Sequence, residues 1–223
     1  MKKISVKNII NFKNKSDKSR KTFIVNLGKE KEADSEGGGD YWVRSMSALS
    51  NAVKEKNTQP IKEKIDDIIE SFKPDTIKQT KDMYQRNLDV LYNYEDFDIN
   101  NWLPDGAEIL NKANKKSVIE INGIPVQINP NQLYSFTRDN NKYVGGIWFL
   151  AKLSGFSKED LGIFAESLYI FLVRHFEDTH SIDPENCLIV DVLSKEEVNY
   201  KLLLDGKIKS SLFNVLDEIK TIK

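Results

Sequence analysis

The first 21 residues concentrate side chains that can contact phosphate. Residues 2–21 carry a net charge of +7, because Asp17 is their one carboxylate against the cations Lys2, Lys3, Lys7, Lys13, Lys15, Lys18, Arg20 and Lys21. Clustered Lys and Arg side chains neutralise phosphates and release counterions from nucleic acid. High charge is common in exposed loops, so a solvated hairpin tip is the simpler interpretation of this segment. The alternative hypothesis is DNA or RNA binding through Lys13, Lys15, Lys18, Arg20 and Lys21.

The remaining chemistry-bearing residues give weaker signals. His175 and His180 are the only histidines, and their spacing of five does not stack them as metal ligands on one helix face. The single cysteine, Cys187, lies in an apolar segment, which favours a core position over a nucleophile. No serine occupies a nucleophile elbow, and no glycine pattern follows a strand as a dinucleotide fingerprint requires. We therefore expect no cofactor and no metal from these residues.

Three strands are expected in the middle of the chain. Residues 117–122 and 125–136 alternate apolar and polar side chains, and Asn122-Gly123 between them is typical of a tight hairpin turn. Residues 138–141 then turn the chain into the segment from Tyr143 to Ala151. That segment is almost continuously apolar, which predicts a central strand covered on both faces.

A helix and a fourth strand are expected next. Ser157 with Asp160 three positions later predicts a helix start, and apolar residues at spacings of three and four continue to Phe176. The apolar segment from Cys187 to Leu193 follows this helical crossover and is expected to run parallel to the strand before it. We expect the four strands to form one mixed sheet, with this helix and the helix of residues 61–72 packed on it.

The flanking segments complete a single-domain prediction for residues 1–223. Residues 4–12 and 22–27 are expected to form an N-terminal β-hairpin, followed by a flexible loop, so that residues 1–44 form one part. Residues 45–116 are expected to be helical, including a helix opened by Pro60, another after Pro74 and a short one at 107–113. Residues 117–223 form the sheet-containing core and end in an amphipathic helix at 208–219. The predicted class is α+β or α/β.

The order helix, strand, strand, strand, helix, strand (αβββαβ) is the core order of the PD-(D/E)XK nuclease-like superfamily. The chain resembles a member of that superfamily over about residues 58–196. Asn129-Pro130-Asn131 lies where an active member has Pro-Asp, and Gly146-Ile147-Trp148 lies where it has Asp or Glu, any residue, then Lys. The resemblance implies a nuclease-type fold in a bacterial or phage system that handles or defends against foreign DNA.

The matched positions lack the residues of the catalytic motif. Such nucleases hold a divalent cation with carboxylates and place a Lys beside the attacking water. Asn131, Gly146 and Trp148 supply neither a carboxylate nor a lysine, so the resemblance implies a degenerate member. Lys152, Glu166 and Gln132 are the only candidates for a relocated site, which would use Mg²⁺ or Mn²⁺.

These observations leave three functional hypotheses. The first is a catalytically degenerate, nuclease-like module that binds nucleic acid or a protein partner. The second is a metal-dependent nuclease with relocated residues, and the third is a structural or protein-interaction domain. No apolar run approaches the roughly 20 residues that cross a bilayer, and no signal-peptide core follows Met1, so no membrane contact and a cytoplasmic location are expected.

Overall fold

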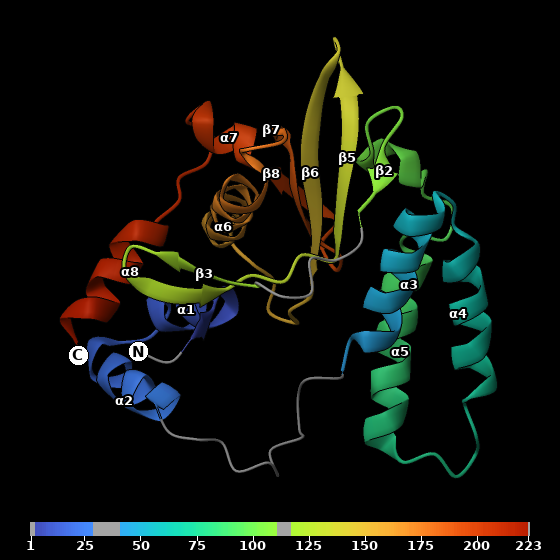
Figure 1. Cartoon of the computed structure of the whole chain (residues 1–223). Helices are drawn as coiled ribbons and strands as arrows, with labels where there is room; N and C mark the ends of the chain where they lie inside the picture. Colours follow the sequence, from blue (N-terminus) through green and yellow to red (C-terminus); the bar gives the residue numbers. More distant parts are fainter. Residues whose placement is uncertain (1–2, 29–40, 111–116, 223) are drawn as a thin grey trace.

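The protein has an α+β fold with two separate sheets, as Figure 1 shows. The computed structural model describes residues 3–28, 41–110 and 117–222. Helices on both sides enclose the larger sheet, and the smaller sheet lies beside it with the N- and C-terminal helices. The predicted class of a mixed α and β protein is confirmed.

The larger sheet has the strand order β2-β5-β6-β7-β8. Its strands are β2 (Glu108–Ile109), β5 (Gln132–Arg138), β6 (Asn141–Leu150), β7 (Ser181–Asp191) and β8 (Glu196–Asn199). β5 and β6 are antiparallel, whereas β6 and β7 are parallel and joined by α6 (Lys158–Phe176). β6 therefore lies at the centre of the sheet, as its unbroken apolar sequence predicts.

The crossover helix α6 starts where the sequence predicts. Ser157 accepts a hydrogen bond from the Asp160 backbone N–H, and the Asp160 carboxylate accepts one from the Ser157 N–H, which completes a capping box. Leu161, Phe164 and Leu168 lie on the face of α6 that is buried against the sheet. The N-terminus of α6 and the carboxyl end of β6 therefore lie at the same end of the sheet.

The strands β3 (Val118–Ile121) and β4 (Ile124–Gln127) do not belong to the larger sheet, so the prediction of one continuous mixed sheet is wrong. Asn122 and Gly123 have positive φ angles of 50° and 72°, which confirms the predicted tight hairpin. β4, however, pairs in parallel with β1 (Ile4–Ser5), giving a three-stranded sheet of order β1-β4-β3. The expected long strand of residues 125–136 is consequently split into β4 and β5.

The predicted N-terminal β-hairpin is also wrong, because the segment forms two helices. They are α1 (Val6–Lys13) and α2 (Asp17–Gly28). Ser5 caps α1 by accepting a hydrogen bond from the Asn8 backbone N–H, and Val6, Ile9 and Ile10 form its buried face. Their spacing of three and four residues is helical, and the prediction of strands did not take this period into account.

Three antiparallel helices lie on the other side of the larger sheet, and α3 is the one that contacts β5: α3 (Val43–Glu55), α4 (Gln59–Glu70) and α5 (Lys78–Tyr92). We call them the three-helix unit. The helix begun by Pro60 is confirmed, but α4 packs on α3 and α5, so its predicted position on the sheet is wrong. The expected helix at 107–113 is replaced at Glu108–Ile109 by β2, and the rest of it lies outside the described residues.

Short elements close the remaining edges. A 3₁₀ turn (Ile99–Trp102) leads into β2, α7 (Tyr200–Leu204) follows β8, and α8 (Leu212–Thr221) forms the predicted C-terminal helix. Two apolar cores lie on opposite faces of the larger sheet, one under α6, α1 and α8 and the other under the three-helix unit. Because strands β5, β6 and β7 contribute side chains to both cores, neither core is separate from the sheet.

Candidate functional site

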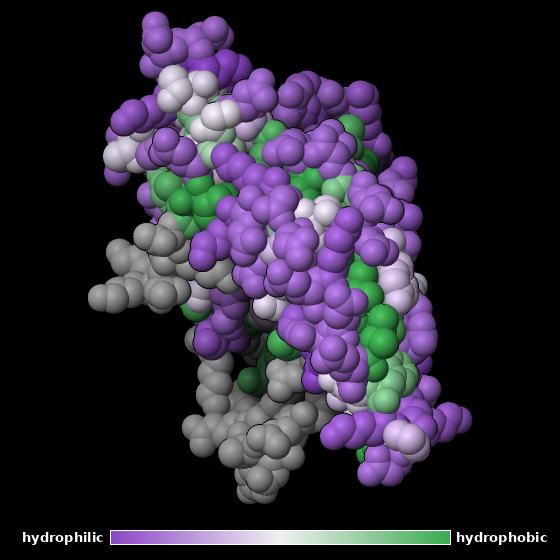
Figure 2. Space-filling model, turned by 90° about the vertical axis from the view of Figure 1, so that its right-hand side faces the viewer, coloured by the Kyte–Doolittle hydropathy of each residue, from purple (hydrophilic) through white to green (hydrophobic). Residues whose placement is uncertain are grey.

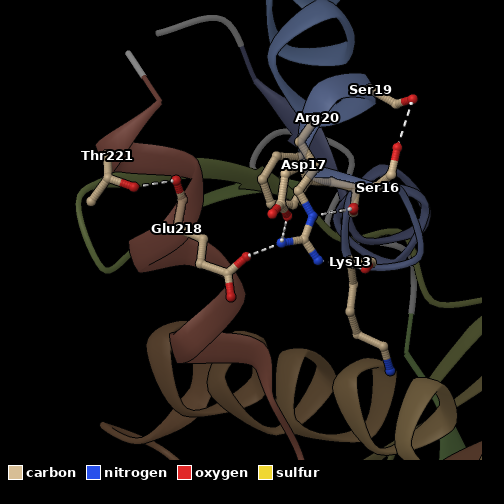
Figure 3. Close-up of polar contacts among 8 residues, drawn as sticks. Lys13, Ser16, Asp17, Ser19, Arg20, Glu218 and Thr221 are labelled. Atoms are coloured by element: carbon tan, nitrogen blue, oxygen red, sulfur yellow. Dashed lines mark hydrogen bonds and ion pairs between the residues drawn. The ribbon is translucent and has the colours of Figure 1, made fainter.

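Arg20, one of the predicted phosphate-binding cations, is engaged within the fold. Figure 3 shows its guanidinium between α1, α2 and α8. Nη1 lies 2.8 Å from the Glu218 carboxylate of α8, Nη2 donates to the Lys13 carbonyl at 2.8 Å, and the group lies over the Phe12 ring. A guanidinium bound by a carboxylate, a carbonyl and an aromatic ring ties three helices together and leaves little surface for a phosphate.

Lys13 is engaged in the same way at the start of α6. Its Nζ lies 2.7 Å from the Asp160 Oδ1 and 3.3 Å from the Glu159 Oε2. The Asp160 side chain is 6% exposed and that of Lys13 is 18% exposed. Burial acts to raise the pKa of Asp160, but the hydrogen bond and charge of Lys13, with the two bonds to Ser157, outweigh it and hold that pKa below its usual value. Lys13 therefore anchors α1 to α6.

Lys15, Lys18 and Lys21 remain exposed on α2 and the turn before it. The Lys15 ammonium group lies over the Phe23 ring at 5.3 Å, and the residue is nevertheless exposed. Within the described part of the chain, none of these three lysines forms an ion pair with a carboxylate. The structure thus divides the five predicted cations into two that hold the fold and three that are available to a partner.

Each position matched to the nuclease motif has a role in packing. The Asn131 side-chain oxygen accepts a hydrogen bond from the Phe149 backbone N–H at 2.8 Å. A Cβ atom at Gly146 would lie 2.9 Å from the Leu133 side chain, so close packing against β5 favours glycine there. Trp148 contacts the Phe164 ring edge-on at 5.0 Å.

The three candidates for a relocated metal site do not come together. Gln132 donates to the carbonyl and the hydroxyl of Ser50 in α3, on the face of the sheet under the three-helix unit. Glu166 belongs to α6 on the opposite side, where burial raises its pKa while a hydrogen bond from Ser210 lowers it by a smaller amount. Lys152 lies over the Phe156 ring at 5.4 Å. Across the described ranges, no three His, Cys, Asp or Glu side chains gather as metal ligands.

A cavity of about 320 Å³ lies at the carboxyl end of β6, and we call it the β6 cavity. Trp148, Phe149, Leu150 and Ala151 line it from β6 and the residue after it, and Phe156 and Phe164 from the start of α6. The other lining residues are Ser5, Val6, Lys7, Trp42, Met46, Gln127 and Asn129. The carboxyl ends of parallel strands, where the chain crosses from one layer to another, are common ligand sites in α/β sheets.

The β6 cavity is lined both by aromatic rings and by polar side chains that have no hydrogen-bonding partner among the described residues. Trp148 and Phe156 both stand edge-on to the Phe164 ring, at 5.0 and 5.8 Å between ring centres. Between Val144 and Leu150, Trp148 is the one residue of β6 that is not fully buried. The side chains of Lys7, Gln127 and Asn129 form no hydrogen bond or ion pair with a residue that the structure describes.

Comparison with protein families, with curated proteins and with solved structures finds no match to this chain. Sequence reasoning identified Trp148 and the 129–131 segment as positions of interest but did not identify Trp42 or the cavity. The wall of the cavity comes from segments far apart in the chain, and no local pattern connects them.

Among the described residues, no helix has both the length and the apolar composition required to cross a bilayer.

Proposed function

We propose that the protein is a catalytically degenerate, nuclease-like module that binds nucleic acid through exposed lysines of its N-terminal helical segment, in the cytoplasm. The observation that carries this proposal is the exposure of Lys15, Lys18 and Lys21 without carboxylate partners among the described residues. Exposed, unpaired cations on one short segment are suited to phosphate contact, because each neutralised phosphate releases counterions. Such contacts carry little sequence information, so the binding is expected to be largely sequence-independent.

Packing supports the non-catalytic part of the proposal. The positions that an active relative uses for metal and lysine are occupied by Asn131, Gly146 and Trp148, and each is committed to a hydrogen bond, a close approach or a ring contact. The alternative, a metal-dependent nuclease with relocated residues, requires Gln132 and Glu166 to act across the sheet that separates them. Their positions favour a binding role over hydrolysis.

The proposal is tested by measuring the affinity of a nucleic acid duplex for the wild type and for two variants that each lack three lysines. Fluorescence anisotropy is measured with the wild type, with the variant Lys15→Ser, Lys18→Ser, Lys21→Ser, and with a matched control. The control replaces three exposed lysines of the three-helix unit or its loop that have no carboxylate partner among the described residues: Lys54→Ser, Lys73→Ser and Lys78→Ser. Both variants lose three positive charges, so the comparison separates a local site from overall charge.

We expect the N-terminal variant to lose most of its affinity and the control to retain affinity close to that of the wild type. Both variants should keep thermal midpoints close to that of the wild type, because exposed charges contribute little to stability. Equal losses in the two variants would show a non-local effect of charge. Absence of binding by the wild type at low salt would reject the proposal.

A protein partner is the second candidate, and exposed apolar residues on the three-helix unit favour it. Val43, Ile69, Phe72, Ile77 and Tyr92 are exposed, with Ile77 at 66%. Figure 2 looks onto the side of the molecule where α4 lies and shows apolar residues gathered in a strip between hydrophilic ones. Exposed apolar residues mark a protein interaction site where they lie together on one surface. A partner retained by the wild type but lost by Ile69→Ser with Ile77→Ser would support this candidate.

A further inference from the structure

Aromatic side chains line the β6 cavity and make it suitable for a flat aromatic ligand. Trp148 and Phe156 stand around the Phe164 ring, and Trp42 lines the cavity from the start of α3. Aromatic rings pack favourably face to face with an offset or edge to face, and an indole offers the largest such surface among side chains. The volume of about 320 Å³ is near the lower end of the range for small organic ligands, roughly 300–1,000 Å³. The cavity thus suits a ligand of one or two fused rings.

The polar side chains that line the β6 cavity indicate which class of aromatic ligand it would bind. Gln127 and Asn129 each present an amide that both donates and accepts hydrogen bonds, as the edge of a nucleobase requires. Lys7 supplies a cation, and none of the described residues that line the cavity carries a carboxylate. Lys152 stands next to the cavity over the Phe156 ring, and it has no carboxylate partner in the described ranges. The buried carboxylate of Asp160, in the first turn of α6, is already paired with Lys13.

We propose that the β6 cavity binds a single nucleobase with its attached phosphate. The base stacks on Trp148, with Trp42 as a further aromatic wall. Its edge is hydrogen-bonded by Gln127 and Asn129, and Lys7 contacts the phosphate. Base–aromatic stacking tolerates any sequence because every base has a π face.

The bound base can come from an unpaired segment of a nucleic acid strand, and in that case the inference rests on the proposed function. A free nucleotide presents the same chemistry and is the other source. A paired base within a duplex cannot enter the cavity, because its faces are covered by its neighbours. Lys7 lies near the start of α1 and Lys15 follows its end, so a strand that contacts both lysines spans the length of α1.

The experiment uses the full chain and three small probes: adenosine monophosphate, ribose 5-phosphate and inorganic phosphate. Calorimetric titration measures binding of each probe to the wild type and to two cavity variants, Trp148→Leu and Asn129→Ala. The matched control is Phe213→Leu, which shortens an exposed aromatic residue of α8 away from the cavity. Tryptophan fluorescence gives a second readout, because Trp42 and Trp148 line the cavity, whereas Trp102 is buried behind the lining residue Phe149 and donates its indole N–H to Glu197.

We expect saturable binding of adenosine monophosphate with quenching of tryptophan fluorescence, and weaker binding of the two probes that lack a base. Trp148→Leu should weaken binding of adenosine monophosphate roughly 5- to 150-fold, the range measured for loss of a stacking side chain. Asn129→Ala should weaken it by a smaller factor, and Phe213→Leu should leave it unchanged. Equal affinity for ribose 5-phosphate and adenosine monophosphate, or equal affinity in Trp148→Leu and the wild type, would overturn the inference.

Oligonucleotides separate the two sources and the two proposals. If the base comes from a strand, Trp148→Leu weakens binding of a single-stranded oligonucleotide and spares that of a duplex. If the source is a free nucleotide, Trp148→Leu weakens binding of adenosine monophosphate alone. Duplex binding that depends on Lys15, Lys18 and Lys21, with no binding of adenosine monophosphate and no effect of Trp148→Leu on the single strand, would overturn this inference while leaving the proposed function in place.

Discussion

Replacing Lys13 with serine should destabilise the protein, although the sequence alone predicts that Lys13 is one of the exposed lysines that bind phosphate. The substitution removes the cation 2.7 Å from the Asp160 carboxylate, whose side chain is only 6% exposed. Asp160 then keeps its capping bonds with Ser157 but loses its counter-charge. A carboxylate left unpaired in a buried position is costly because it can neither hydrate fully nor find another cation.

The magnitude follows from the degree of burial. Removing one partner of a fully buried ion pair costs about 3–5 kcal/mol, whereas an exposed pair contributes about 0–1 kcal/mol. With Lys13 18% exposed and Asp160 nearly buried, we expect Lys13→Ser to lower the free energy of unfolding by roughly 2–4 kcal/mol. For a chain of this size, that corresponds to a fall in Tm of roughly 4–16 °C.

Urea and thermal denaturation followed by circular dichroism at pH 7 measure the effect. Lys18→Ser is the control, because Lys18 is exposed and unpaired within the described residues, and its change should stay within about 0.5 kcal/mol. The pKa of Asp160 is lowered in the folded state, so its contribution to stability is present above the pKa of the unfolded chain, about 4. The gap between wild type and Lys13→Ser should therefore persist from pH 7 to 5 and narrow as pH falls through the folded-state pKa. Equal stability of Lys13→Ser and Lys18→Ser at pH 7 would refute the anchoring role.

Three further predictions follow from other contacts. Asn131→Ala should lower the free energy of unfolding by about 1–3 kcal/mol, measured by urea denaturation, because the Phe149 backbone N–H loses its acceptor; an unchanged midpoint would contradict that role. The Cys187 thiol, whose pKa is raised by burial, should react with a thiol reagent only after unfolding, and rapid labelling of the folded protein would contradict its buried position. Purified protein should leave DNA and RNA uncut in Mg²⁺ or Mn²⁺ on a gel, whereas cleavage abolished by Glu166→Gln or Lys152→Ala would establish the nuclease alternative.

The elements that the sequence predicts correctly carry their information locally. The apolar sequence of β6, the Asn122-Gly123 turn and the capping box of Ser157 and Asp160 each act within a few residues, and all three are confirmed. The smaller sheet escaped prediction because it depends on parallel pairing of Ile4 with Val126, far apart in the chain. Without that pairing, the alternating residues of β3 and β4 are indistinguishable from strands of the larger sheet.

The candidate site was predicted in part, for a related reason. The sequence shows how many cations lie in the first 21 residues, but not which of them have carboxylate partners. Arg20 meets Glu218 and Lys13 meets Asp160 only after α1, α6 and α8 are packed together. The β6 cavity cannot be predicted from local sequence either, because Trp42 and Trp148, which both line it, are far apart in the chain.

The central claim, that the protein binds nucleic acid through three exposed lysines, is tested most directly by salt dependence. Affinity for one duplex is measured from low to physiological salt for the wild type and for the variant Lys15→Ser, Lys18→Ser, Lys21→Ser. Each lost phosphate contact should reduce the log–log slope by about 0.9, so the slopes should differ by roughly 2.7 if all three lysines neutralise phosphates. Identical slopes for the two proteins would contradict the claim, because the three lysines would then contact no phosphate.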